Sequence, residues 1–115
     1  MTTVGLHVAA ERALDRLRAE VALHATRLTA AVRAQRYESA AVDAERIARL
    51  YELLARWWML IYPSLYDEKR LLGLAALGAG SEERISAEAY RKIAETYRQL
   101  AERVAGVHRS DLAVG

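Results

Sequence analysis

The segment ALDRLRAEVALHATRLTAA, residues 13–31, carries an apolar residue or a histidine at every third or fourth position. This seven-residue repeat puts one apolar stripe on a helix, the pattern that packs against a second helix. The stripe consists of Ala10, Leu14, Leu17, Val21, His24, Leu28 and Ala31. No Gly or Pro occurs between Gly5 and Pro63. We therefore predict a helix over residues 6–35.

A second stripe follows and predicts a helix over residues 38–62. It consists of Tyr37, Ala40, Ala44, Ile47, Tyr51, Leu54, Trp58 and Ile61. Without a helix breaker, the two segments fit either one long helix or a hairpin. We expect a hairpin with its turn near 35–37, because the stretch AQRYESAA resembles the turn inside tetratricopeptide-type helical hairpins. The chain has no 34-residue repeat, so the resemblance is limited to this turn.

Pro63 is expected to end the second helix or to kink it. Ser64 then provides a helix cap, which predicts a short third helix over residues 64–77. The sequence Gly78-Ala79-Gly80 is a plausible stop for that helix.

Ser86 predicts the start of a last helix over residues 86–106, with Gly106 as its C-terminal cap. Residues 107–115 are left as a short tail. Strand-type alternation is absent from the sequence. We therefore predict an all-α domain over residues 1–106, either a four-helix bundle or a long helical hairpin with a short third helix and a C-terminal helix.

The composition excludes several classes of protein. The 115 residues include no Cys, so disulfides, thiol nucleophiles and thiolate metal sites are excluded. We recognise no secretory signal and no membrane-spanning run, and we expect a cytoplasmic protein or one inside a phage particle. The net charge is only +2, with Arg far more frequent than Lys. The scarcity of heat-labile residues fits a thermophile, and equally a GC-rich genome.

The end of the second predicted helix is apolar on nearly all sides, which is unusual for a surface helix. Either the third helix covers it, or it is a subunit interface with a Trp anchor. We expect self-association or binding to other protein subunits, as in a phage particle or a multi-subunit complex. The candidate interface residues are Trp57, Trp58, Leu60, Tyr62, Tyr66 and Leu74.

A basic stretch suggests an alternative function. Residues 21–37 contain Arg27, Arg33 and Arg36 and no acidic residue. They either contact nucleic-acid phosphates near the hairpin tip or form a solvated helix end. A nucleic-acid-associated accessory subunit is therefore the second hypothesis.

The sequence offers little chemistry for a cofactor, metal or catalytic site. Glu20 and His24 are four residues apart, but a metal site needs three or four ligands, so His24 is interpreted as a packing residue and no metal or cofactor is expected. The opening Leu14-x-x-Leu17-Arg18-x-x-Val21 is similar to that of the AroQ-type chorismate mutases, and the segment 67–70 is weakly similar to a later motif of that family. The resemblance would imply a dicarboxylate bound by Arg18, Arg70 and Gln99. The acid expected after Arg70 is missing, and we favour a non-enzymatic protein.

Overall fold

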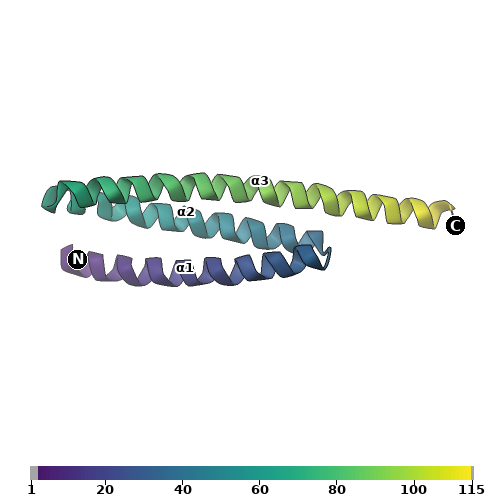
Figure 1. The fold of residues 1–115 in the computed structure, drawn as a ribbon, viewed down its shortest axis with the longest axis horizontal. Coiled ribbons are helices and arrows are strands. Elements are labelled where there is room, and N and C mark those ends of the chain that lie inside the picture. The colour runs from purple at the N-terminus through teal and green to yellow at the C-terminus, as the bar shows by residue number, and fades with distance from the viewer. Residues whose placement is uncertain (1–2, 115) are drawn as a thin grey trace.

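Three long helices form the structure, which is a computed structural model (Figure 1). It describes the backbone of residues 3–114 and the side chains of residues 5–67 and 69–107. The helices are α1 (Thr3–Arg33), α2 (Tyr37–Glu68) and α3 (Arg70–Val114). The all-α prediction is confirmed. The division into four helices is not, because only three helices are found among the described residues.

The turn between α1 and α2 lies where the sequence predicts it. The N–H of Arg36 donates to the carbonyl of Ala31 (2.8 Å), and the N–H of Gln35 donates to that of Val32 (3.0 Å). These two hydrogen bonds form a Schellman motif, which ends a helix by placing one residue in the left-handed region. That residue is Gln35, with φ of 57°. The hairpin interpretation is therefore correct, and the alternative of one continuous helix is not.

The prediction that the second helix ends at Pro63 is wrong. Pro63 lies inside α2, which continues to Glu68. The chain turns instead at Lys69, a single extended residue with φ of −146° and ψ of 105°. Its N–H donates to the carbonyl of Leu65 (2.7 Å), and its own carbonyl accepts from the N–H of Gly73 (3.1 Å). Residues 66–72, on either side of Lys69, include no Gly, Pro or Asn, so the turn-residue rules could not find this turn.

The predicted helices over 64–77 and 86–106 are also corrected. Residues 64–68 belong to the end of α2, and residues 70–77 begin α3, which passes without interruption through Gly78, Gly80, Ser86 and Gly106. A glycine inside a helix costs about 1 kcal/mol. Buried contacts along α3 outweigh that cost, since Ala76, Ala87 and Ala94 are almost fully covered. Residues 107–114, predicted as a tail, continue the same helix.

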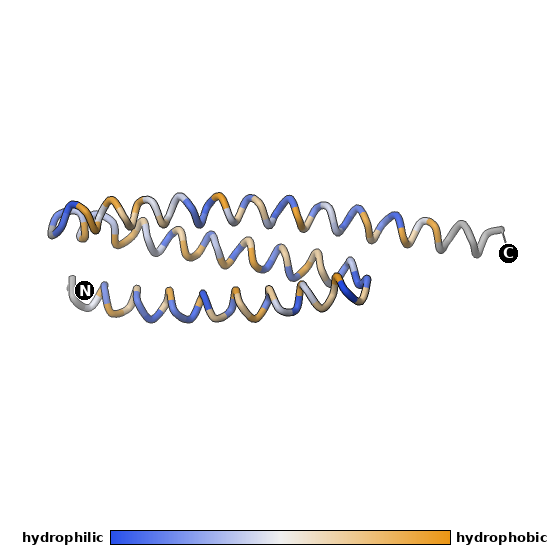
Figure 2. The backbone as a smooth tube through the Cα atoms, viewed as in Figure 1, coloured by the Kyte–Doolittle hydropathy of each residue, from blue (hydrophilic) through white to orange (hydrophobic). Residues whose placement is uncertain are grey.

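Two seams run along α2, one for each neighbour. Small residues make the seam with α3, where Ala48 lies beside Ala94 and Ala55 beside Ala87. Larger residues make the seam with α1, centred on the cluster Leu14, Leu17, Leu50 and Leu54. Figure 2 shows apolar residues recurring along all three helices.

The helices are arranged openly rather than as a compact triangle. Among the described residues, no Cα of α1 lies within 8 Å of a Cα of α3. The molecule measures 70 × 21 × 19 Å, with a radius of gyration of 19.1 Å. A compact globule of this length would have a radius of about 13 Å. In addition, α3 runs past the α1–α2 hairpin tip (Figure 1).

Candidate interaction surface

The tryptophans predicted as interface anchors lie mainly against the core. Trp57 and Trp58 are half-buried and pack on the cluster of Leu14, Leu17, Leu50 and Leu54. The guanidinium of Arg18 lies 5.7 Å from the Trp58 ring, in cation–π geometry. The Nε1–H of Trp58 is buried and has no hydrogen-bond partner among the described residues. Both residues therefore hold α1 against α2.

The predicted tyrosines form the packing at the turn between α2 and α3. The rings of Tyr62 and Tyr66 lie 5.7 Å apart at an angle of 47°. The guanidinium of Arg70 lies 5.8 Å from the Tyr66 ring. Both tyrosines are half-buried. As the sequence interpretation allowed, part of the apolar surplus is covered when the chain folds back on itself.

The two predicted leucines remain at the surface, together with several neighbours that were not singled out. Leu60 is 55% exposed and Leu74 is 51% exposed. The others are Leu53, Leu71, Leu72 and Ile85, of which Leu71 is 82% exposed. We call Leu53, Leu60, Leu71, Leu72, Leu74 and Ile85 the corner surface, since they lie on the two helix ends that meet at Lys69 or a few turns away from it.

The corner surface has a regular spacing on α3. Leu71, Leu74, Gly78 and Ile85 are separated by three, four and seven residues. This is the spacing of a seam that packs against another helix. On α2, Leu53 and Leu60 are also seven residues apart. The sequence prediction did not include this repeat, because it ended a helix at residues 78–80 and so divided the row. The repeat is complete only when residues 70–114 form one helix.

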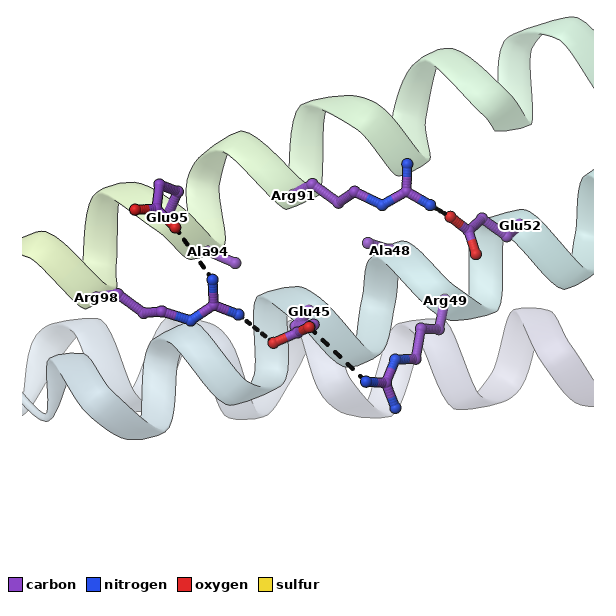
Figure 3. Close-up of a pocket in the computed structure, with 8 residues that line it drawn as sticks. All are labelled: Glu45, Ala48, Arg49, Glu52, Arg91, Ala94, Glu95 and Arg98. Carbon is purple, nitrogen blue, oxygen red and sulfur yellow. Dashed lines mark hydrogen bonds and ion pairs between the residues drawn. The ribbon is translucent and has the colours of Figure 1, made fainter.

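A ladder of ion pairs joins α2 and α3 on one flank (Figure 3). Arg91 pairs with Glu52, and Arg98 pairs with Glu45. Glu45 also lies 3.7 Å from Arg49, and Glu95 lies 3.1 Å from Arg98. The carboxylates of Glu45 and then Glu95 raise the pKa of Arg98 further above its ordinary value.

On the opposite flank of the α2–α3 seam, two pairs of tyrosines stack. Tyr37 and Tyr97 have ring centroids 6.1 Å apart, and Tyr51 and Tyr90 have centroids 5.7 Å apart. Burial raises the pKa of Tyr51, and Tyr90 and Glu83 raise it further. This flank faces α1, because Tyr51 also packs against the cluster that contains Leu14 and Leu17 of α1. Burial raises the pKa of Glu83; Arg18 opposes this effect and Glu82 adds to it.

The predicted arginine site is only partly assembled. Arg27 and Arg36 line one depression near the hairpin tip, and Arg33 is exposed without lining it. Glu38 and Asp43 line the same depression, so its charge is balanced. The Nδ1 of His24 lies 3.3 Å from Oδ1 of Asp43, a contact between α1 and α2.

The residues of the chorismate-mutase resemblance do not come together within one chain. Arg70 and Gln99 lie on the same continuous helix. At 1.5 Å per residue they are about 43 Å apart along its axis. The guanidinium of Arg18, on α1, lies over the ring of Trp58, on α2. A single small dicarboxylate cannot reach Arg70 and Gln99 at once.

Among the described residues, no cluster of three or more His, Cys, Asp or Glu side chains is placed to hold a metal ion. Within the same part of the chain, no helix combines the length and the hydropathy needed to cross a bilayer. No protein-family model, no curated protein and no solved structure matches the chain significantly.

Proposed function

We propose that this protein is a structural or adaptor subunit that works by binding a helix of another protein at the corner surface. The observation that carries the proposal is a row of exposed apolar residues on one face of α3, where Leu71, Leu74 and Ile85 are 82%, 51% and 69% exposed. Single exposed leucines are ordinary, but exposed apolar patches on soluble proteins often mark interaction sites.

The spacing of the patch indicates the kind of partner. An amphipathic helix presents its apolar residues at intervals of three, four and seven. Leu71 and Leu74 are three residues apart on α3, and Ile85 follows Leu74 after eleven residues, which is one step of four and one of seven on the same face. We therefore expect the partner to contribute an apolar helix face, which would lie along the first four turns of α3.

The nucleic-acid alternative has less support. Arg27 and Arg36 share their depression with Glu38 and Asp43. A phosphate-binding site gains from cations that are not already neutralised by nearby carboxylates. The balanced charge therefore offers no concentrated positive potential at the hairpin tip.

The test is to purify the protein with its partner from its source and to reconstitute the complex from the two isolated components. Leu74→Glu should weaken this binding at least about tenfold, because a charge would be buried in an apolar contact. Val42→Glu is the matched control, since Val42 is 64% exposed on α2 and far from the corner surface. If both variants bind like the wild type, the corner surface is not the site.

A further inference from the structure

A depression on the flank that carries the ion-pair ladder holds an excess of positive charge. Ala55 of α2 and Ala87 of α3 form its floor, and both are almost fully buried. Arg56 lines it from α2, and Arg84 and Arg91 line it from α3. We call it the 56–84 depression. Because alanine side chains end at the β-carbon, the floor stays low between two walls of long charged side chains.

The two arginines that name the depression stand at nearly the same height on facing helices. Ala55 lies beside Ala87, and α2 and α3 run antiparallel (Figure 1). Arg56 follows Ala55 directly, and this step leads toward the turn at Lys69. Arg84 precedes Ala87 by three residues, which also leads toward that turn. At 1.5 Å per residue, the two positions differ by about 3 Å along the helices. Both guanidinium groups can therefore reach one small ligand.

Neither Arg56 nor Arg84 has an ion-pair partner among the described residues. Glu52 precedes Arg56 by four residues and lines the same depression, but it pairs with Arg91 of α3 (Figure 3). Glu88 lines the depression as well, and in the same part of the chain no ion pair joins it to Arg84. Three guanidinium groups thus share the depression with two carboxylates, one of which is already engaged.

The positive excess is confined to this one depression. The neighbouring depression along the seam, drawn in Figure 3, is lined by three arginines and three glutamates. The depression of Arg27 and Arg36 near the hairpin tip is lined by two residues of each sign. A long polyanion that entered the 56–84 depression would therefore meet carboxylates on leaving it. The arrangement favours a single compact anion.

We propose that the 56–84 depression binds one phosphate group, held between the guanidinium groups of Arg56 and Arg84. A guanidinium presents parallel N–H donors that match two oxygens of a phosphate. A phosphate dianion has enough oxygens for both arginines and neutralises both positive charges. The inference goes beyond the proposed function and does not depend on it, since it involves none of the apolar residues of the corner surface.

The test is a titration of the purified chain with inorganic phosphate at constant ionic strength, followed by NMR of the arginine Nε–H groups. The signals of Arg56 and Arg84 should shift together and saturate. Arg56→Gln and Arg84→Gln should each raise the dissociation constant at least about tenfold, because charge-assisted hydrogen bonds are lost. Arg49→Gln is the matched control. It removes the same charge one depression away, seven residues before Arg56 on α2, and should change the constant less than about twofold.

Glu88→Gln should have the opposite effect. It removes the unengaged carboxylate from the depression and should lower the dissociation constant about threefold or more, because a nearby negative charge repels the anion. All four substituted residues are exposed, so circular dichroism should show unchanged helix content in each variant.

Two results would overturn the inference. One is the absence of saturable shifts at Arg56 and Arg84. The other is an equal loss of affinity in Arg49→Gln and Arg56→Gln, which would show that phosphate responds only to the net charge of the chain. Neither result would affect the partner-binding test at Leu74.

Discussion

Gly73 lies directly against the backbone of Tyr66, at the turn where α2 meets α3. A β-carbon at position 73 would overlap the Cα, Cβ and N atoms of Tyr66. Glycine is therefore required here by the close approach of two helices, and not by an unusual backbone angle. Lys69 alone joins the helices, and the hydrogen bond from Gly73 N to its carbonyl fixes the start of α3.

Gly73→Ala should destabilise the protein by about 1–3 kcal/mol, because overpacking at a rigid contact exceeds the gain in helix propensity. Gly78 provides the control on the same helix, since a β-carbon there meets no atom within 4 Å. Gly78→Ala should stabilise the protein by about 0.5–1 kcal/mol. Urea denaturation measures both. Equal effects of the two substitutions would contradict the close packing at Tyr66.

The same contrast shows what the sequence could and could not reveal about the fold. The stripes of residues 10–31 and 37–61 predicted α1 and most of α2, because the apolar face of a helix shows in short-range spacing. The turn near Gln35 was predicted from the resemblance of residues 34–41 to the turn of a helical hairpin. Pro63, Gly78 and Gly80 were interpreted as breaks. Their cost of about 1–3 kcal/mol each is real, but it is smaller than the tertiary packing along α2 and α3.

A second prediction concerns Gln35, the residue with φ of 57° in the turn between α1 and α2. The left-handed conformation costs a non-glycine residue about 1 kcal/mol or more. Gln35→Gly should therefore stabilise the protein by up to about 1 kcal/mol, despite the greater freedom of glycine in the unfolded chain. Thermal unfolding followed by circular dichroism measures the change.

Ala34 is the matched control for this turn. It immediately precedes Gln35, and its N–H donates to the carbonyl of Ala30 at 3.0 Å, as in a helix. Ala34→Gly should lower the stability, because glycine gains nothing at a helical position. If Gln35→Gly destabilises the protein as much as Ala34→Gly does, the Schellman geometry of the turn is contradicted.

A third prediction concerns the ion pair of Arg91 and Glu52, which joins α3 to α2. Both side chains are partly exposed, at 55% and 31%. A double-mutant cycle with Arg91→Gln and Glu52→Gln should give a coupling energy of only about 0.2–1 kcal/mol. In 1 M salt the coupling should fall, because ions screen exposed charges. A coupling above about 2 kcal/mol that salt does not change would show that the pair is shielded from solvent.

The candidate surface could be predicted only in part. The sequence showed that the segment around Trp57 and Trp58 has apolar residues on too many sides, and Leu60 and Leu74 are exposed as the interface interpretation requires. It could not show that the tryptophans pack on the Leu14 cluster, because a stripe does not specify which neighbour covers it. The ion pairs between α2 and α3 depend on the antiparallel register of the two helices. The spacing of residues within one helix does not determine that register.

The last prediction follows from Glu83, whose pKa is raised above its ordinary value of 4.5, chiefly by burial. A raised pKa means that the folded state holds the proton more tightly than the unfolded state. The stabilisation this provides is therefore complete below pH 4.5 and is lost as the pH rises through the folded-state pKa. Glu83→Gln removes the titration. The variant should gain stability relative to the wild type between pH 4 and pH 7, as measured by urea denaturation at both values.

Arg18 supplies the check on this mechanism, because its positive charge lowers the pKa of Glu83 and so works against burial. In an Arg18→Gln background, the carboxylate of Glu83 would lose that compensation. The gain in stability from Glu83→Gln between pH 4 and pH 7 should then be larger than in the wild-type background. A smaller gain would mean that Arg18 does not act on Glu83 across the open side between α1 and α3.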